Sequence, residues 1–384
     1  MAVTELVELY EDLHRHPELS GAEERTAAVL ARELGALGFA VRTGVGGHGV
    51  VAAFDNGDGP AVALRTELDA LPLVERTGLP YAADGAAMHA CGHDLHLAAV
   101  IGAARELVAD RASWRGRLVV LGQPAEETLD GALAMVADDL HGVGPLAALL
   151  AQHAVPGPVG RVGHSPGQIT APCTELAITV HGRGGHAAVP HLAVDPVVLA
   201  AHLVVRLQSV VSRETNPAEP VVVTVGAIHA GEAANVIPDR VELGVSVRAA
   251  TDGALAGALA ALERVCRAEA EASGAAVEPE VKTVRSAPAT TNDRHLAIAV
   301  RAAHVAGLGA GSVTWTAPVA AAEDVGHLAR RPDGTRVPLC YWTLGVGSRG
   351  TNHSPDFAPE PAALSAGGRA LAVAARAVLT VTSE

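Results

Sequence analysis

The chain has 384 residues, of which 49% are hydrophobic and 2% aromatic, and its formal net charge is −14. This length suits two domains better than one. The negative charge argues against a general binder of nucleic acids or anionic membranes, because both present negative surfaces. We therefore expect a globular protein with neither of these partners.

The N-terminus lacks the basic and then apolar pattern of a signal peptide. No apolar run approaches the roughly 20 residues that span a bilayer. The four cysteines form no CxxC pair and are far apart, at Cys91, Cys173, Cys266 and Cys340. We expect a cytoplasmic protein with reduced thiols, in which Cys91 is free to act as a thiolate.

The first third of the chain alternates between helical and extended patterns. Residues 20–37 are predicted to form a helix, with Ser20 as its cap and Glu23 completing a capping box. A second helix is predicted over 96–110. Three apolar runs predict strands, at 49–54, 61–69 and 117–127. This alternation predicts an α/β sheet whose chemistry gathers in the loops beyond the strand ends.

A second pattern begins near residue 173. It reads strand, helix, strand, strand, helix, strand, over 174–182, 195–213, 221–231, 240–249, 252–274 and 276–284. This βαββαβ order is typical of a ferredoxin-like unit. We predict a catalytic α/β domain with a mixed sheet, residues 1–172 and 287–384, interrupted by an inserted lid and dimerisation domain, residues 173–286.

Two short motifs offer metal ligands. In "HACGHD", Cys91 and His93 lie two residues apart, so in an extended loop both side chains would face one ion. An isolated pair of this kind is more often a buried thiol beside a surface histidine. In "QPAEET", one of Glu126 and Glu127 can hold a metal while the other faces bound water as a general base. An exposed acidic turn is the alternative.

Two further histidines complete a candidate set. His153 leaves an apolar run and His353 lies in a loop rich in glycine and proline; singly, each fits a structural or surface role. Five candidate ligands suffice for two ions that share a bridging group: Cys91, His93, Glu127, His153 and His353. A thiolate with imidazoles favours zinc, and the carboxylate content leaves manganese or another first-row ion open.

A series of motifs then carries a family resemblance. "LRTELDALP", "MHACGHDLH", "GQPAEE", "QHAV", "GRGGHAAVPH", "NVIPD" and "TNHSPDFAPE" occur in an order that resembles the metal-dependent N-acyl-amino-acid amidohydrolases. That group includes aminoacylases, hippurate hydrolases and auxin-conjugate hydrolases within the aminoacylase and carboxypeptidase superfamily. The resemblance extends from about residue 10 to 365.

The resemblance implies a role for each matching residue. Cys91, His93, Glu127, His153 and His353 match the metal ligands, and Glu126 matches the general base. Asp69 matches an aspartate that orients a metal-binding histidine. His186 matches a residue that reaches the partner subunit's site and steadies the oxyanion, which implies a homodimer. Asn235 and Arg248 match residues that hold the substrate carboxylate.

The sequence departs from the family pattern at two places. Glu67 stands where relatives commonly have aspartate, and the segment 321–328, "AAEDVGHL", lacks the usual aromatic residue. We expect the longer Glu67 side chain to shift the groups around the site and 321–328 to contact the acyl group. Three other histidines are expected to support the site or the structure, namely His89, His96 and His191. For His96, at the start of a helix, a surface role is preferred to ligation, and with Asp94 it is a candidate support for the metal site.

These features predict a dinuclear hydrolase that cleaves the amide of N-acyl amino acids. A dipeptidase or carboxypeptidase with the same site is the nearest alternative, since both substrates leave a free carboxylate for Arg248. A metal-free thiol amidase, with Cys91 as nucleophile and His153 as base, is a second class. A metal-stabilised binding protein without catalysis is a third, and the intact "PAEE" motif argues against it.

Overall fold

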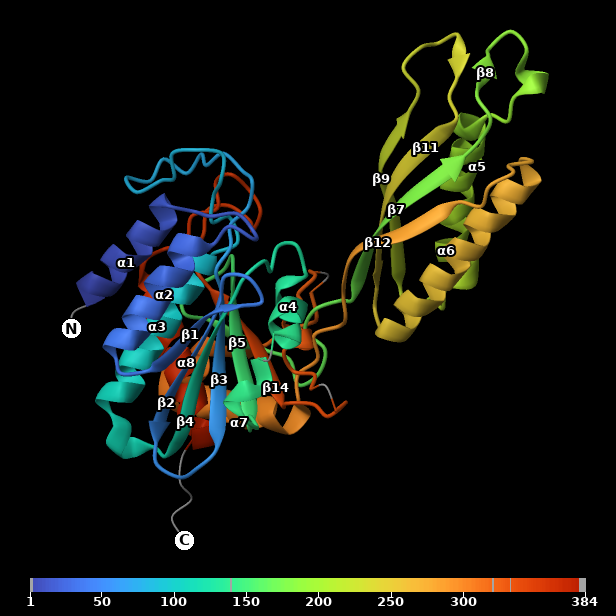
Figure 1. Cartoon of the computed structure of the whole chain (residues 1–384). Helices are drawn as coiled ribbons and strands as arrows, with labels where there is room; N and C mark the ends of the chain where they lie inside the picture. Colours follow the sequence, from blue (N-terminus) through green and yellow to red (C-terminus); the bar gives the residue numbers. More distant parts are fainter. Residues whose placement is uncertain (1–2, 139, 320, 332, 380–384) are drawn as a thin grey trace. The chain divides into compact units, whose positions relative to one another are not determined.

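The computed structural model describes residues 3–138, 140–319, 321–331 and 333–379, which form two compact units (Figure 1). The first unit comprises residues 1–169, 290–318 and 324–384, and the second comprises 170–289 and 319–323. The main junctions lie three residues from the predicted ones, at 169 in place of 172 and at 289 in place of 286. The short segment 319–323, which the sequence assigned to the catalytic domain, groups with the second unit.

An eight-stranded mixed sheet forms the centre of the first unit, with the strand order β1-β2-β4-β3-β5-β14-β6-β13. Its strands are β1 (Ala40–Val45), β2 (Gly49–Asn56), β3 (Ala61–Glu67), β4 (Gly116–Gln123), β5 (Ala148–Val155), β6 (Val162–His164), β13 (Val313–Trp315) and β14 (Leu339–Gly345). The central strands β4, β3, β5 and β14 run parallel to one another. They are apolar and buried, as strands covered on both faces must be.

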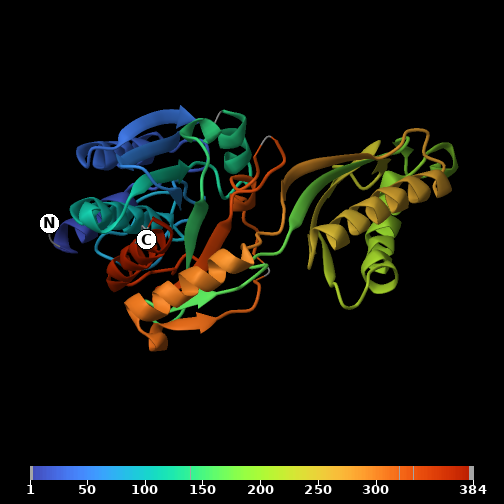
Figure 2. The same cartoon turned by 90° about the horizontal axis from the view of Figure 1, so that it is seen from below.

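Helices cover both faces of this sheet (Figure 2). They are α1 (Val3–Arg15), α2 (Glu24–Ala36), α3 (His93–Ala109), α4 (Gly131–Ala137), α7 (Arg294–Leu308) and α8 (Ala362–Leu379), with 3₁₀ turns at Arg111–Ser113, Leu140–Val143, Ala310–Ser312 and Val325–His327. Alternate residues of one strand separate the two layers: Val62 and Leu64 pack toward α2, α3 and α8, whereas Ala63 packs with Met135 of α4.

Helix α8 is the one described helix that is long and apolar enough to cross a membrane, with a mean hydropathy of 1.3 over 18 residues. From the apolar runs in the sequence we expected no such helix. More than half of α8 is buried, and it packs along α3 and α7 inside the first unit. This packing is that of a core helix.

The predicted capping box at the start of α2 is wrong. The helix begins at Glu24, and neither Ser20 nor Glu23 caps it. The Glu18 carboxylate caps the first turn instead, accepting from the backbone of Arg25 and Thr26 at 3.0 and 2.7 Å. The Ser20 hydroxyl instead donates to Asp69 at 2.8 Å, and the Glu23 carboxylate accepts from the backbone of Gly21 and of Ala125, at 2.9 and 2.8 Å. The two polar residues therefore tie this segment to the loops after β3 and β4.

The second unit is a four-stranded antiparallel sheet in the order β12-β7-β11-β9, backed by two helices. In chain order its elements are β7 (Cys173–His181), α5 (Pro196–Ser209), β9 (Val221–Ala230), β11 (Arg240–Ala249), α6 (Asp252–Ala272) and β12 (Glu280–Ala287). The predicted βαββαβ unit is confirmed. Both helices start at polar caps, because Asp195 accepts from the backbone of Val197 and Thr251 accepts from that of Ala254.

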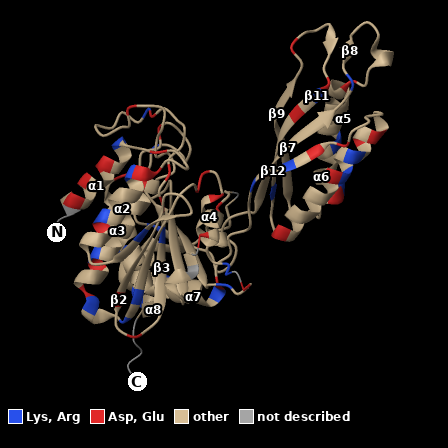
Figure 3. Ribbon diagram, viewed as in Figure 1, with Lys and Arg blue, Asp and Glu red and all other residues tan. Residues whose placement is uncertain are grey.

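A loop arm extends this second sheet beyond the β7–β11 pair. It holds a two-stranded ladder of β8 (Gly185–His186) and β10 (Val236–Ile237) and a 3₁₀ turn at Pro190–Leu192. Helix α5 continues into a π turn at Val210–Glu214, outside this arm. Acidic and basic residues are interspersed on α2 and α6 (Figure 3). Charged residues of both signs on these two helices indicate that one face of each helix is in contact with solvent.

Candidate metal centre

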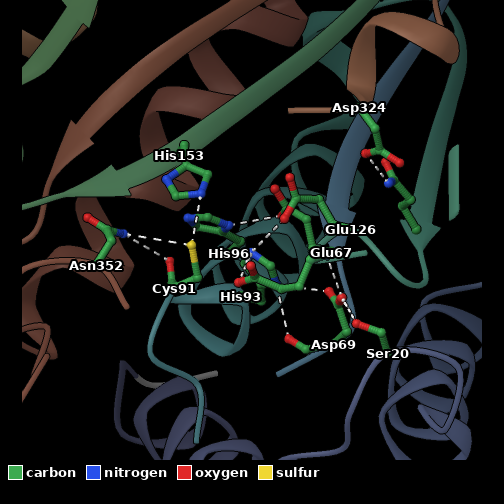
Figure 4. A network of polar contacts seen from close by, with 12 residues as sticks. Ser20, Glu67, Asp69, Cys91, His93, His96, Glu126, His153, Asp324 and Asn352 are labelled. Carbon is green, nitrogen blue, oxygen red and sulfur yellow. Dashed lines mark hydrogen bonds and ion pairs between the residues drawn. The ribbon is translucent and has the colours of Figure 1, made fainter. Parts of the chain in front are cut away.

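The strand ends of the first unit bring the predicted site residues together (Figure 4). β3 ends at Glu67 and β4 at Gln123, two and four residues earlier than the apolar runs suggested, so Asp69 and Glu126 lie in the following loops. His153 lies near the end of β5. Since β3, β4 and β5 are parallel neighbours, their C-terminal ends meet at one edge of the sheet.

Cys91 and His93 flank a left-handed glycine and do not form the extended loop that we expected. Gly92 has φ = 85°, and His93 is already the first residue of α3. A Cβ at Gly92 would lie 3.1 Å from Cβ of Ala154, so glycine suits both the conformation and the close approach. The turn still directs both side chains to one place, because each lies within 4.8 Å of the His153 ring nitrogens.

Two sets of candidate ligands share the thiol. The first donor set is Cys91, His93 and His153, and the second donor set is Cys91, Glu127 and His353. In each set the ligand atoms lie within 4.8 Å of one another, Cys91 Sγ being 3.4 Å from His153 Nε2 and His353 Nε2 3.4 Å from Glu127 Oε2. The structure thus brings all five sequence-predicted ligands together, and their role as ligands stays a prediction.

His93 is oriented as a ligand requires. Its Nδ1 lies 3.0 Å from Oδ1 of Asp69, whose other oxygen accepts from the Glu127 backbone at 2.9 Å. The buried Nε2 has no hydrogen-bond partner among the residues that the structure describes, and Glu126 Oε2 lies 3.7 Å away. A carboxylate that fixes the far nitrogen of a histidine is the usual support for a metal ligand. The residues present therefore fit a cation.

Charges at the site favour a cation. Burial opposes protonation of His93, but the Asp69 hydrogen bond and the charges of Glu67 and Glu127 raise the pKa of His93 to about 10. Burial, together with Glu127 and Glu126, raises the pKa of the Cys91 thiol well above its usual range. Burial also raises the pKa of Glu127. A divalent ion would reverse these effects and hold Cys91 as a thiolate.

The expectation that His96 is a surface residue is wrong. His96 is 1% exposed, and its Nδ1 lies 2.9 Å from Oε2 of Glu67. Its Nε2 accepts from the Ala154 backbone at 2.7 Å. Both ring nitrogens are therefore engaged, so His96 is no ligand although it stands near His93.

Glu126 lies where a general base is needed. Its side chain is buried in the loop after β4, within reach of both His93 and Glu127. The loop is tight, since Ala125 and Leu129 have φ values of 49° and 60° and a Cβ at Gly131 would lie 1.6 Å from a backbone oxygen. This turn brings both carboxylates toward His93, whose Nε2 lies 3.7 Å from Glu126 Oε2 and 3.9 Å from Glu127 Oε1.

We expected the segment 321–328 to contact the acyl group of the substrate. At Asp324 and Val325 this expectation is not met. Both residues are fully buried. Asp324 accepts from Gln123 at 2.6 Å and from the first turn of α4 at 3.0 Å, and Arg65 lies 3.6 Å away. These two residues support the strand ends beneath the site and do not form an acyl-binding wall.

Sequence reasoning missed two further residues that touch the site. The Asn352 amide donates to the Ala154 carbonyl at 3.0 Å and lies 3.9 Å from Cys91 Sγ. Arg65, inside β3, is fully buried and pairs with Glu67. Arg65 could have been noticed as the one cation inside a largely apolar strand, whereas nothing local marks Asn352 beyond its neighbour His353.

The predicted substrate-binding residues lie in the second unit. His186 and Asn235 meet there, since the Ala187 backbone donates to the Asn235 carbonyl at 3.1 Å and both side chains are exposed. Arg248 lies near the other end of β11, because the loop arm joins the sheet beside Arg240. Eight residues of strand are about 27 Å. The structure therefore separates Arg248 from Asn235, and the roles of all three residues stay predictions.

Comparison with known proteins identifies the class to which this fold and site belong. Residues 63–377 match the model described as peptidase family M20/M25/M40. The chain is similar to an N-acetyl-L-cysteine deacetylase of Bacillus subtilis, 41% identical over 64% of this chain and 59% of that protein. It is also similar to a hippurate hydrolase of Campylobacter jejuni, 35% identical over 75% of each chain.

The same class appears among solved structures. The Bacillus subtilis YXEP protein, described as a dinuclear metal binding peptidase from the M20 family, superposes with a TM-score of 0.81. It is 29% identical, and the match covers 99% of both chains. The fold and the site are those of a metal-dependent amidohydrolase. The chain belongs to peptidase family M20/M25/M40.

Proposed function

We propose that the protein hydrolyses the amide bond of N-acyl amino acids, using two divalent ions held by the two donor sets. The observation that carries the proposal is the position of Cys91, which both donor sets share. A single thiolate between two ligand groups supports two ions close together, with Glu126 beside them. The names of the deacetylase and hippurate hydrolase relatives favour acylated amino acids as substrates.

Different residues of the chain would activate water, bind the substrate and stabilise the oxyanion. When bound, the ions would make water more acidic and polarise the scissile carbonyl. Glu126 would take a proton from the attacking water, whose oxygen bonds to the carbonyl carbon, and would deliver it to the amine nitrogen as the C–N bond breaks. Arg248 is suited to pair with the substrate carboxylate, and His186 to stabilise the oxyanion. Zinc is the ion that one thiolate and three imidazoles favour, with manganese as the next choice.

We infer a homodimer that works in the cytoplasm. The outer face of α5 exposes Val197, Val198 and Val205, the last to 74%, and β9 is an edge strand with exposed Val222. An apolar helix face beside an open sheet edge supports pairing with a second copy. All four cysteines are free and buried, which supports a reducing compartment.

Two alternatives predict different chemistry. A dipeptidase would use the same residues, and the peptidase family description supports it; comparing dipeptides with N-acyl amino acids separates the two. A thiol amidase is favoured by the 3.4 Å contact of Cys91 with His153. However, burial and two glutamates raise the pKa of Cys91, whereas a nucleophilic thiol needs a lowered pKa.

The experiment is the substitution Glu126→Gln, with activity and bound metal measured on the same sample. Turnover should fall by about 10²-fold or more, because proton transfer by the base is lost. Two ions per chain should remain, because Glu126 belongs to neither donor set. Glu278→Gln, at an exposed position of the second unit, is the control and should change neither value. A Glu126→Gln enzyme with wild-type turnover would overturn the assignment.

A further inference from the structure

The main chain of Ala154 joins several parts of the candidate metal centre. Its N–H, in the peptide that directly follows His153, donates to His96 Nε2 at 2.7 Å. Its carbonyl accepts from Nδ1 of His153 at 2.9 Å and from the Asn352 amide at 3.0 Å. Because Ala154 directly follows the candidate ligand His153, contacts that hold this backbone also hold the imidazole.

The hydrogen bonds determine where the protons are. A backbone N–H can only donate, so Nε2 of His96 carries no proton and its Nδ1–H donates to Glu67 Oε2 at 2.9 Å. The Ala154 carbonyl can only accept, so Nδ1 of His153 carries a proton. The Nε2 of His153 is then left with a lone pair, 3.4 Å from Cys91 Sγ.

The other end of this chain of contacts is firmly anchored. Glu67 is fully buried, and its second oxygen pairs with Arg65, whose Nε donates to Gln123 at 2.9 Å. An aspartate at position 67 would be shorter by about 1.5 Å, the length of one carbon–carbon bond. Its carboxylate would lie beyond hydrogen-bonding distance of His96. Glu67, which departs from the family pattern, is therefore long enough to reach His96, whereas an aspartate would not be.

We propose that His96 is a positioning residue, which with Glu67 holds the Ala154 peptide and thereby sets the direction of His153. This inference rests on the proposed dinuclear site and states which of its two donor sets His96 supports. His96 supports the first donor set, which contains His153. The second donor set, of Cys91, Glu127 and His353, does not depend on this contact.

The test is the number of zinc ions bound per chain in His96→Phe, measured by mass spectrometry under native conditions. Phenylalanine keeps the ring and removes both hydrogen bonds, so one of two ions should be lost or bound 10- to 100-fold more weakly, roughly the usual effect of such supporting contacts. His96→Gln should restore the second ion, because its amide oxygen can accept from Ala154. A His96→Phe protein that binds both ions with wild-type affinity would overturn the proposal.

A matched control is His304→Phe, the same substitution at a buried histidine of α7 that bonds the Ala370 carbonyl at 2.9 Å. It should bind two ions. If His96→Phe does not fold, Glu67→Asp is the milder variant, and it should also weaken one ion selectively. Glu67→Asp with two ions at wild-type affinity would equally overturn the proposal. Failure of the unaltered protein to bind two ions would instead refute the proposed function.

Discussion

Nδ1 of His14 lies 2.6 Å from Oδ2 of Asp94, so the last turn of α1 is bound to the residue that follows His93. The opposite nitrogen of His14 lies 3.2 Å from Glu75. Burial opposes a charge on His14, but the two carboxylates raise the pKa of His14 to about 10. A buried imidazolium thus joins α1, the loop before Cys91 and the start of α3.

We expect His14→Gln to reduce the free energy of unfolding by about 3 kcal/mol or more, because it leaves two buried carboxylates without their cation. Urea denaturation at pH 7 measures the change. His16→Gln is the matched control, since His16 directly follows the same helix and is half exposed; it should change stability by less than about 0.5 kcal/mol. Equal effects of the two substitutions would show that the buried pair contributes nothing.

A buried histidine pair between β6 and α7 predicts how stability depends on pH. His164 Nε2 lies 2.9 Å from His304 Nδ1, and both rings are fully buried. Burial, His304 and Arg301 lower the pKa of His164 to about 3, and burial lowers the pKa of His304 to about 4. The unfolded chain, with an ordinary pKa near 6.5, therefore binds protons that the folded protein does not.

This difference stabilises the protein above pH 6.5 and is lost as the pH falls from about 6.5 toward 4. Between pH 7 and pH 5, each of the two buried histidines should lower the free energy of unfolding by about 2 kcal/mol. In His164→Phe the fall over the same range should be smaller by about that amount. Parallel stability curves for the two proteins would contradict the prediction.

The separation of Arg248 from His186 and Asn235 predicts how two chains share a site. If His186 acts in the partner's site, a heterodimer of His186→Ala and Glu126→Gln chains contains one site with both residues intact. Each variant alone should be nearly inactive, whereas a mixture allowed to exchange subunits should recover about a quarter of wild-type activity. Native mass spectrometry verifies the exchange. Heterodimers without recovered activity would place His186 in its own chain's site.

Sequence reasoning predicted most of the fold because its signals are local. The apolar runs and the alternation of strand and helix patterns each depend on a few neighbouring residues. The predicted capping box of Ser20 and Glu23 failed because the Ser20 hydroxyl donates instead to Asp69, which is distant in the sequence. Such competition depends on packing and leaves no mark on the local pattern.

The candidate site shows the same division. Cys91, His93, Glu127, His153 and His353 could be named from spacing and resemblance, and the fold brings them together. The sequence suggested both a supporting and a surface role for His96. Its hydrogen bond to Ala154 could not be predicted, because the partner is a main-chain group brought near by the fold. The separation of Arg248 from Asn235 likewise follows from strand length and register, not from either motif.

The central claim is metal-dependent hydrolysis of N-acyl amino acids, and amine release tests it most directly. The substrates would be N-acetyl amino acids and matched dipeptides, assayed before chelation, after chelation and after zinc is returned. The account predicts release from the N-acetyl amino acids that chelation abolishes and zinc restores. Release that chelation leaves unchanged would contradict it, as would a protein that holds two ions and cleaves none of these substrates.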